Sequence, residues 1–74
     1  MNNNIKAERV RAGKTIAEVA KQIGTSPNSV YNWESAATEP NARSLVRLAN
    51  LYDCSPDYLL DMTDERHGRA APTA

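Results

Sequence analysis

The sequence predicts an all-α fold, a compact bundle of five short helices in one domain. Helix-capping residues recur along the chain, the apolar residues between them follow helical spacing, and strand signals are nearly absent. With 74 residues, of which 41% are hydrophobic, the chain has the length and composition of one small globular domain. We expect residues 1–63 to form this domain and the charged, Gly- and Pro-containing residues 64–74 to form a flexible C-terminal tail.

The first two helices are marked by their ends. A helix is predicted from Ile5 to Ala12 and is stopped by Gly13, a residue that tolerates the left-handed conformation. Thr15 and Glu18 have the spacing of a capping box, so the second helix begins directly after Thr15 and ends before Gly24. Its apolar positions follow helical spacing and are Ile16, Val19, Ala20 and Ile23.

The three later helices each begin with a polar side chain suited to capping. Ser26 precedes Pro27, Asn41 opens the fourth helix, and Ser55 precedes Pro56. Proline is favoured at the first helical position because its missing N–H group would have no partner there. The residues that we expect to face the core from the third and fourth helices are Val30, Trp33, Leu45, Leu48, Ala49 and Tyr52.

The turn between the second and third helices is very short. Only Gly24 and Thr25 separate the second helix from the cap of the third, so the two helices must cross steeply. Ala20 is small enough for the crossing, Gly24 permits a positive φ, and Val30 fills the angle between the helices. This spacing predicts a helix-turn-helix from Ile16 to Ser35.

The outward face of the third helix has the chemistry of a DNA-contacting surface. Asn28 and Asn32 lie one turn apart, and Asn can donate to and accept from an adenine edge in the major groove. The alternative is that these polar residues are only solvated. We predict base contacts from Pro27, Asn28, Ser29 and Asn32.

Phosphate contacts are expected beside this face. The free N–H groups at the start of the second helix, at Thr15 and Ile16, suit an anion, and the hydroxyls of Ser26 and Tyr31 can reach a phosphate. The charge distribution supports an anionic partner only weakly. The part before Ala36 has five basic and three acidic residues, and the part from Ala36 onward has four basic and six acidic residues.

Three stretches resemble a known family. IKAERVRAGKT, IAEVAKQIGTSPNSVYNWES and LVRLANLYDCSPDYLLDMT are similar to the lambda-repressor-like, Cro/repressor-type helix-turn-helix proteins, also called the XRE family. The resemblance implies a transcriptional regulator, usually a repressor, that places its third helix in the major groove of double-stranded DNA. It also implies a homodimer on a two-fold-related operator and a cytoplasmic protein of bacterial or phage origin.

The chain departs from the family pattern at two phosphate-contacting places. Ile16 stands where relatives commonly have Gln, and Ser35 and Ala36 stand where they often have Asn and Gly followed by a basic residue. We expect Ser35, Lys14 and Arg43 to supply the missing contacts, with Lys6 a weaker candidate.

Family resemblance also implies two structural roles. Arg9 and Glu34 match a pair that forms an internal salt bridge between the first and third helices. The last helix is often the dimer contact, which predicts a dimer patch of Tyr58, Leu60 and Met62 with the last two exposed. The alternative is that the residues of this region only complete the core; the full set is Tyr52, Tyr58, Leu59 and Leu60.

The composition argues against several other functions. Cys54 and His67 are the only residues of their types, so no metal site is expected; Cys54 should be structural and His67 solvated in the tail. Neither a nucleophile–base set nor a Gly-rich phosphate loop is present, so we expect no enzyme and no cofactor. No apolar run approaches the ~18 residues of a membrane helix. A protein-interaction module, such as an antitoxin-like partner-binding protein, remains the alternative function, favoured by the zero net charge.

Overall fold

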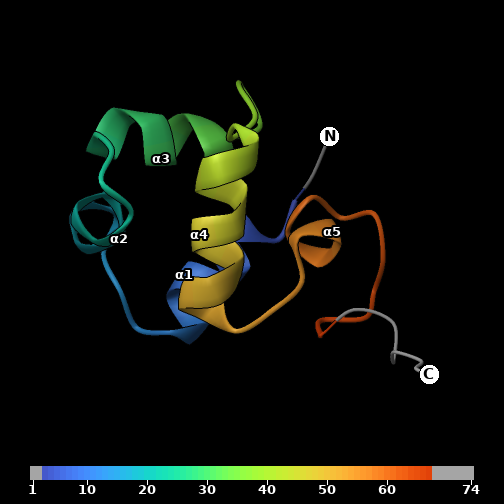
Figure 1. The fold of residues 1–74 in the computed structure, drawn as a ribbon. Helices are drawn as coiled ribbons and strands as arrows, with labels where there is room; N and C mark the ends of the chain where they lie inside the picture. The colour runs from blue at the N-terminus through green and yellow to red at the C-terminus, as the bar shows by residue number, and fades with distance from the viewer. Residues whose placement is uncertain (1–2, 68–74) are drawn as a thin grey trace.

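The computed structural model describes residues 3–67 and confirms the all-α, five-helix fold. No strand occurs among these residues. α4 runs through the middle of the molecule, with α2 and α3 on one side and α5 on the other (Figure 1). None of the helices in the described part is long and apolar enough to cross a membrane. The helices are α1 (Ile5–Arg11), α2 (Ile16–Ile23), α3 (Pro27–Glu34), α4 (Ala42–Tyr52) and α5 (Pro56–Leu59).

The predicted caps set the starts of four helices. Thr15 Oγ1 accepts from the Glu18 N–H at 3.1 Å and the Glu18 carboxylate accepts from the Thr15 N–H at 2.8 Å, which completes the capping box. The backbone N–H bond from Thr15 lowers the pKa of Glu18. Ser26, Asn41 and Ser55 each accept a hydrogen bond from the N–H group three residues further on.

α1 lacks a side-chain cap and is held by tertiary contacts instead. The Asn4 N–H donates to the Leu59 carbonyl at 3.0 Å, and Asn4 Nδ2 donates to the Tyr58 carbonyl at 2.7 Å. The start of the first helix is therefore attached to the last one. α1 ends at Arg11, one residue earlier than predicted, because Ala12 is already the C-cap and Gly13 takes a φ of +70°.

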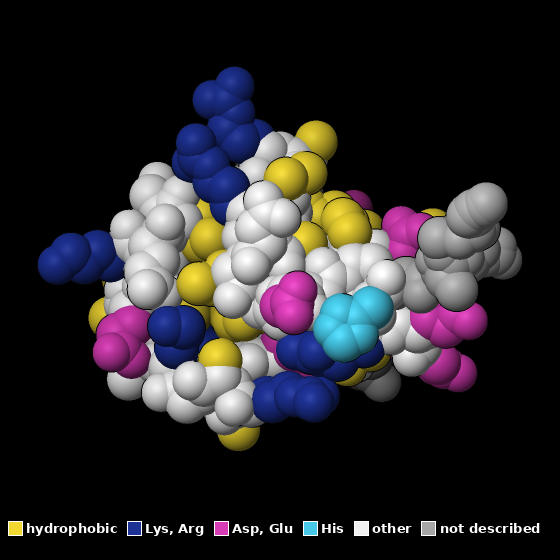
Figure 2. All heavy atoms as spheres, turned by 60° about the horizontal axis from the view of Figure 1, so that its bottom comes forward, with side chains coloured by type: hydrophobic (Ala, Val, Ile, Leu, Met, Phe, Trp, Pro, Cys, Tyr) yellow, Lys and Arg dark blue, Asp and Glu magenta, His cyan; other side chains and the backbone are white. Residues whose placement is uncertain are grey.

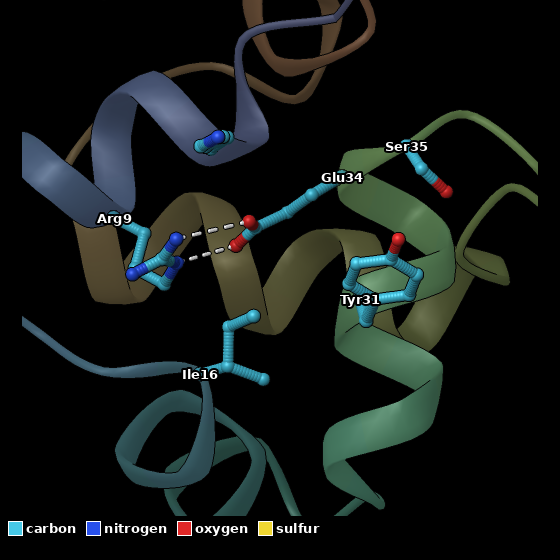
Figure 3. Close-up of a pocket in the computed structure, with 6 residues that line it drawn as sticks. Arg9, Ile16, Tyr31, Glu34 and Ser35 are labelled. Atoms are coloured by element: carbon cyan, nitrogen blue, oxygen red, sulfur yellow. Dashed lines mark hydrogen bonds and ion pairs between the residues drawn. The ribbon is translucent and has the colours of Figure 1, made fainter.

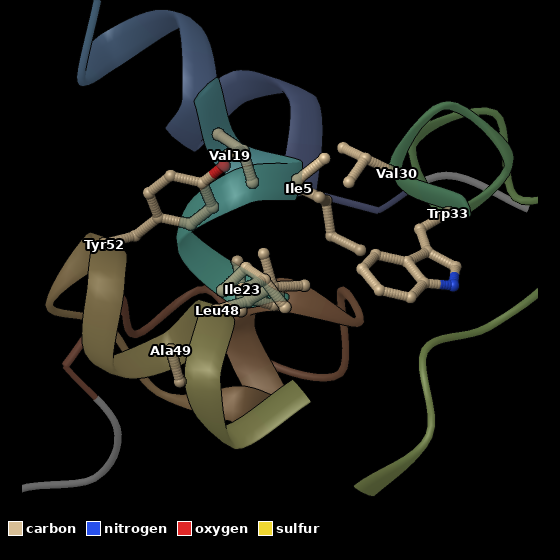
Figure 4. Close-up of a cluster of buried hydrophobic side chains, with 10 residues drawn as sticks. Ile5, Val19, Ile23, Val30, Trp33, Leu48, Ala49 and Tyr52 are labelled. Atoms are coloured by element: carbon tan, nitrogen blue, oxygen red, sulfur yellow. The ribbon is translucent and has the colours of Figure 1, made fainter. Parts of the chain in front are cut away.

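The core lies where α1, α2, α3 and α4 meet, and Leu59 of α5 completes it. Figure 4 shows Val30 and Trp33 pointing from α3 toward Ile5 and the side chains of α2 and α4. Ala20 is fully buried where α2 meets α3, as the steep crossing requires. Ile16 and Leu45 are half-buried and pack against this core, as their helical spacing predicts. The buried hydrophobic residues are Ile5, Val19, Ala20, Ile23, Val30, Trp33, Leu48, Ala49, Tyr52 and Leu59.

A buried carboxylate joins α1 to the C-terminal segment. Glu8 is 2% exposed and receives hydrogen bonds from Arg66 Nη2 at 2.8 Å and from the Tyr58 hydroxyl at 3.2 Å. The Arg66 guanidinium holds the pKa of Glu8 below its usual value, and burial opposes this shift. Arg11 is further away, with its Nη1 at 3.9 Å from the carboxylate.

Packing therefore extends past the expected domain boundary at Thr63. Arg66 Nη2 also donates to the Tyr52 carbonyl at 2.8 Å, and the Ser55 N–H donates to the Arg66 carbonyl at 2.7 Å. These bonds satisfy backbone polar groups between α4 and α5. Composition alone could not predict that Arg66 would take this role. The remaining part of the expected tail, residues 68–74, lies outside the described residues.

Cys54 is structural and His67 is solvated, as the sequence predicts. Cys54 is half-buried against the core, and burial raises the pKa of its thiol to about 11. His67 is exposed, with its Nε2 at 3.8 Å from the Asp53 carboxylate.

Replacing Arg66 with Ala should clearly reduce the free energy of unfolding, because the Glu8 carboxylate would remain buried without its main partner. Urea unfolding monitored by circular dichroism measures this change. Arg11→Ala is the matched control, since this exposed residue has only a long contact with Glu8, and it should cost less than about 0.5 kcal/mol.

The Arg66 effect should also depend on pH in one direction. Because the folded pKa of Glu8 is lowered, its contribution is present above the unfolded value of about 4.3 and is lost as the pH falls through the folded value. The difference between wild type and Arg66→Ala should therefore shrink in acid. Equal losses from the Arg66 and Arg11 substitutions at neutral pH would contradict this account.

Candidate nucleic-acid interface

α3 presents a polar face to solvent because its two apolar anchors point inward. Val30 and Trp33 are buried, and at about 100° per residue the opposite side of the helix carries Asn28 and Asn32. Asn28 is exposed, as is Pro27 at the start of the helix, whereas Asn32 is half-buried. Three of the four predicted base-contacting residues therefore lie at the N-terminal end or on the outward side of one helix.

The fourth predicted base-contacting residue, Ser29, already has a local partner. Its Oγ lies 3.0 Å from Ser26 Oγ, which also accepts from the Ser29 N–H at 3.2 Å. Ser29 is half-buried and Ser26 is exposed. The hydroxyl of Ser26 is thus shared between capping α3 and any contact with a ligand.

A surface hollow brings together three of the predicted phosphate-contacting residues. Ile16 from the start of α2, Tyr31 from α3 and Ser35, the C-cap of α3, line a space of about 250 Å³ (Figure 3). Its remaining lining residues are Lys6, Arg9 and Glu34. Tyr31 is 58% exposed beside this hollow.

The other predicted phosphate-contacting residues lie outside this hollow. Thr15 directly precedes α2, but its side chain and its backbone N–H are both engaged in the capping box, so the expected free N–H at Thr15 is already taken by Glu18. Lys14 lines a separate, open hollow together with Lys21. Arg43 is exposed in the first turn of α4 and is not among the lining residues of either hollow. The cations are therefore dispersed around the interface.

An ion pair forms the floor of the first hollow. Arg9 Nε lies 2.6 Å from Glu34 Oε2, and Arg9 Nη2 lies 3.2 Å from Glu34 Oε1, so the pair is bidentate. The side chains of Arg9 and Glu34 are 15% and 5% exposed, and the hydrogen bond to Glu34 raises the pKa of Arg9. Arg9 Nη1 also donates to the Lys14 carbonyl at 2.9 Å. One guanidinium thus connects α1, the loop before α2, and the end of α3.

Two further side chains support the helix-turn-helix, and the sequence analysis did not predict either of them. Arg47 Nη1 donates to the Ile23 carbonyl at 3.0 Å, just before the turn at Gly24, whose φ is +85°. Asn3 Nδ2 donates to the Trp33 carbonyl at 2.8 Å, near the end of α3. Both bonds join residues more than twenty positions apart, so no local spacing pattern could have found them.

The predicted dimer patch is only partly exposed. Met62 is 71% exposed, but Leu60 is half-buried, which corrects the expectation of an exposed pair. Tyr58 is half-buried as well, because its hydroxyl turns inward to Glu8. Leu60 lines a hollow of about 230 Å³ with residues of the chain start and of the loop after α3, namely Asn3, Ala36, Thr38, Glu39 and Pro40.

The face that carries His67 has a different charge pattern. Figure 2 looks onto this face, with His67 in cyan, and shows basic and acidic side chains intermingled around it. In Figure 1, α3 lies at the opposite end of the molecule. Mixed charge gives no uniform potential for a polyanion, so α3 and its surroundings are the better candidate interface.

Replacing Glu34 with Gln should lower the free energy of unfolding by about 3 kcal/mol, since Arg9 would lose its bidentate carboxylate in a nearly buried position. Glu39→Gln is the matched control, because Glu39 is exposed in the following loop, and it should change stability by less than about 0.5 kcal/mol. Thermal unfolding of both variants tests this, and similar melting temperatures would mean that the ion pair contributes little.

Comparisons with known proteins agree with this geometry. The chain is 38% identical to repressor protein C2 of Salmonella phage P22 over 81% of its own length and 30% of the relative's length. It is 35% identical to the HTH-type transcriptional regulator ImmR of Bacillus subtilis over 81% of its own length and 47% of the relative's. The chain therefore spans less than half the length of these curated relatives.

A solved structure shares the fold. The crystal structure of the P22 c2 repressor protein in complex with a synthetic operator matches with a TM-score of 0.75 and 37% identity, covering 80% of this chain and 89% of that chain. A family model described as helix-turn-helix matches residues 5–59, which include all five helices. The chain belongs to the helix-turn-helix family, in the Cro/repressor-type group that its sequence resembles.

Proposed function

We propose that this chain is the DNA-binding domain of a transcriptional regulator, which represses by occupying an operator with α3 in the major groove. The observation that carries the proposal is the outward pair Asn28 and Asn32 on a helix whose opposite side is anchored by Val30 and Trp33. Two amides one turn apart can each form a bidentate contact with an adenine edge, and each such contact discriminates by about 1–3 kcal/mol. The match to a repressor solved in complex with a synthetic operator supports DNA binding by this chain.

Our proposal includes a homodimer on a two-fold-related operator. Met62 is exposed near the end of the described chain, and half-buried Leu60 lines a hollow with Pro40, so both offer apolar surface for a second copy. A dimer repeats α3 at two successive major-groove segments about one helical turn apart. It regulates by occupancy and performs no reaction, and we place it in the cytoplasm of a bacterium.

Selection of bound sequences from a random duplex pool should yield an inverted repeat, and Asn28→Ala should relax the preference at one position in each half-site. The reason is that Asn28 is exposed on the outward face, where truncation removes a base contact without disturbing the core. Sequencing the bound pool of both proteins measures this. Asn50→Ala is the control, since Asn50 is exposed on α4 and should leave every position unchanged. Absence of any enriched sequence at workable salt would favour a protein-interaction role.

The salt dependence of binding should be shallow. Ile16 and Ser35, which line the hollow beside α3, carry no charge, so few phosphates are neutralised. We expect about four neutralised phosphates per dimer, which gives a slope near −3.6 in log K against log salt. Ser35→Lys should add one phosphate contact per protomer and steepen the slope to about −5.4. Binding titrations by fluorescence anisotropy measure both slopes, and a wild-type slope near −8 would contradict the count.

A further inference from the structure

The hollow between α1, α2 and α3 has little free charge of its own. Its floor is the Arg9–Glu34 pair, in which each charge is neutralised by the other and Arg9 donates further to the Lys14 carbonyl. Among its remaining lining residues, Lys6 is the one cation. Ile16 and Tyr31 supply the apolar part of the wall (Figure 3). The residues of this hollow therefore suit an apolar group of a ligand better than a phosphate.

The wall is continuous with the outward face of α3. Tyr31 follows Asn28 by three residues, which places the two about 60° apart around the helix axis, with Tyr31 on the side of Ile16. Tyr31 therefore stands between the amides directed at base edges and the start of α2, where the backbone N–H groups suit a phosphate. A group bound here would lie between the base edges and the sugar–phosphate backbone.

One base carries an apolar group at that location. Thymine exposes its 5-methyl group in the major groove, on the side of the base nearest its own strand's backbone. We propose that Ile16 and Tyr31 form a contact for a thymine methyl group and so determine specificity for thymine at one position of each half-site. This inference rests on the proposed DNA-binding function. It adds a preference for thymine at an operator position that Asn28 and Asn32 do not contact.

The contact explains two features of the chain together. Tyr31 has a large aromatic ring and is 58% exposed on the helix proposed to face DNA. Exposure of this ring to water does not stabilise the fold, so a contact with a ligand accounts for its position. Ile16 replaces a polar residue at the start of α2 and is half-buried on the rim of the same hollow. Ile16 has no hydrogen-bonding group to offer a phosphate, and together with the Tyr31 ring it extends the apolar surface beside the outward face of α3.

The test replaces thymine with uracil, which removes only the methyl group, at each thymine of the selected operator. Wild-type protein should lose about fourfold in affinity at one position per half-site, the equivalent of one buried methyl group. Tyr31→Ala should bind the thymine and uracil duplexes equally, whereas Tyr31→Phe should keep the difference because its ring is retained. Val46→Ala is the control, since Val46 is an exposed apolar residue on α4 that lines no part of the hollow.

Two results would overturn the inference while leaving DNA binding intact. Wild type could be indifferent to uracil at every position, or Tyr31→Ala could keep the full thymine preference. A uniform loss with Tyr31→Phe on both duplexes, without any uracil effect in wild type, would instead assign the hollow to a phosphate. Failure to select any duplex would remove the proposed function, and this inference with it.

Discussion

The bidentate contact between Arg9 and Glu34 is the constraint on which the interface depends. α3 has eight residues and few apolar anchors, so its position cannot come from burial alone. The guanidinium attaches the end of α3 to α1 and, through the Lys14 carbonyl, to the loop that leads into α2. Because both charges are largely removed from water, each requires the other, and this requirement fixes the relative placement of three elements.

α1 makes a second connection of the same kind in another direction. Glu8 and Arg9 are neighbours in sequence, so their side chains leave the helix about 100° apart. Arg9 bonds to Glu34 on α3, while Glu8 bonds to Arg66 in the C-terminal segment. A short helix with a single deeply buried apolar residue, Ile5, is thus held mainly by directional polar contacts. Polar contacts of this kind specify one arrangement more strictly than a small apolar surface can.

Much of the fold could be predicted because its signals are local. The caps at Thr15, Ser26 and Asn41 act over three residues, and the turn at Gly24 needs only a positive φ. Contacts between distant residues could not be predicted in this way. The pairing of Glu8 with Arg66 spans 58 positions, so a charged segment was expected to be a free tail although one of its residues is held by the core. The Arg9–Glu34 pair was expected only through family resemblance, since spacing alone does not join α1 to α3.

The same locality explains how much of the interface follows from the sequence. Helix periodicity places Asn28 on the outward face of α3, whereas the residues that gather in the hollow beside α3 come from several elements and are brought together only by the fold. The balance of forces is nevertheless constrained by the residues present. With uncharged Ile16, Tyr31 and Ser35 around a neutralised ion pair, and Lys6 as the one further cation of the hollow, this part of the surface would gain little from counterion release in the proposed complex. A protein that attracts the DNA backbone weakly must obtain more of its affinity from base edges, and affinity obtained there is specific by its nature.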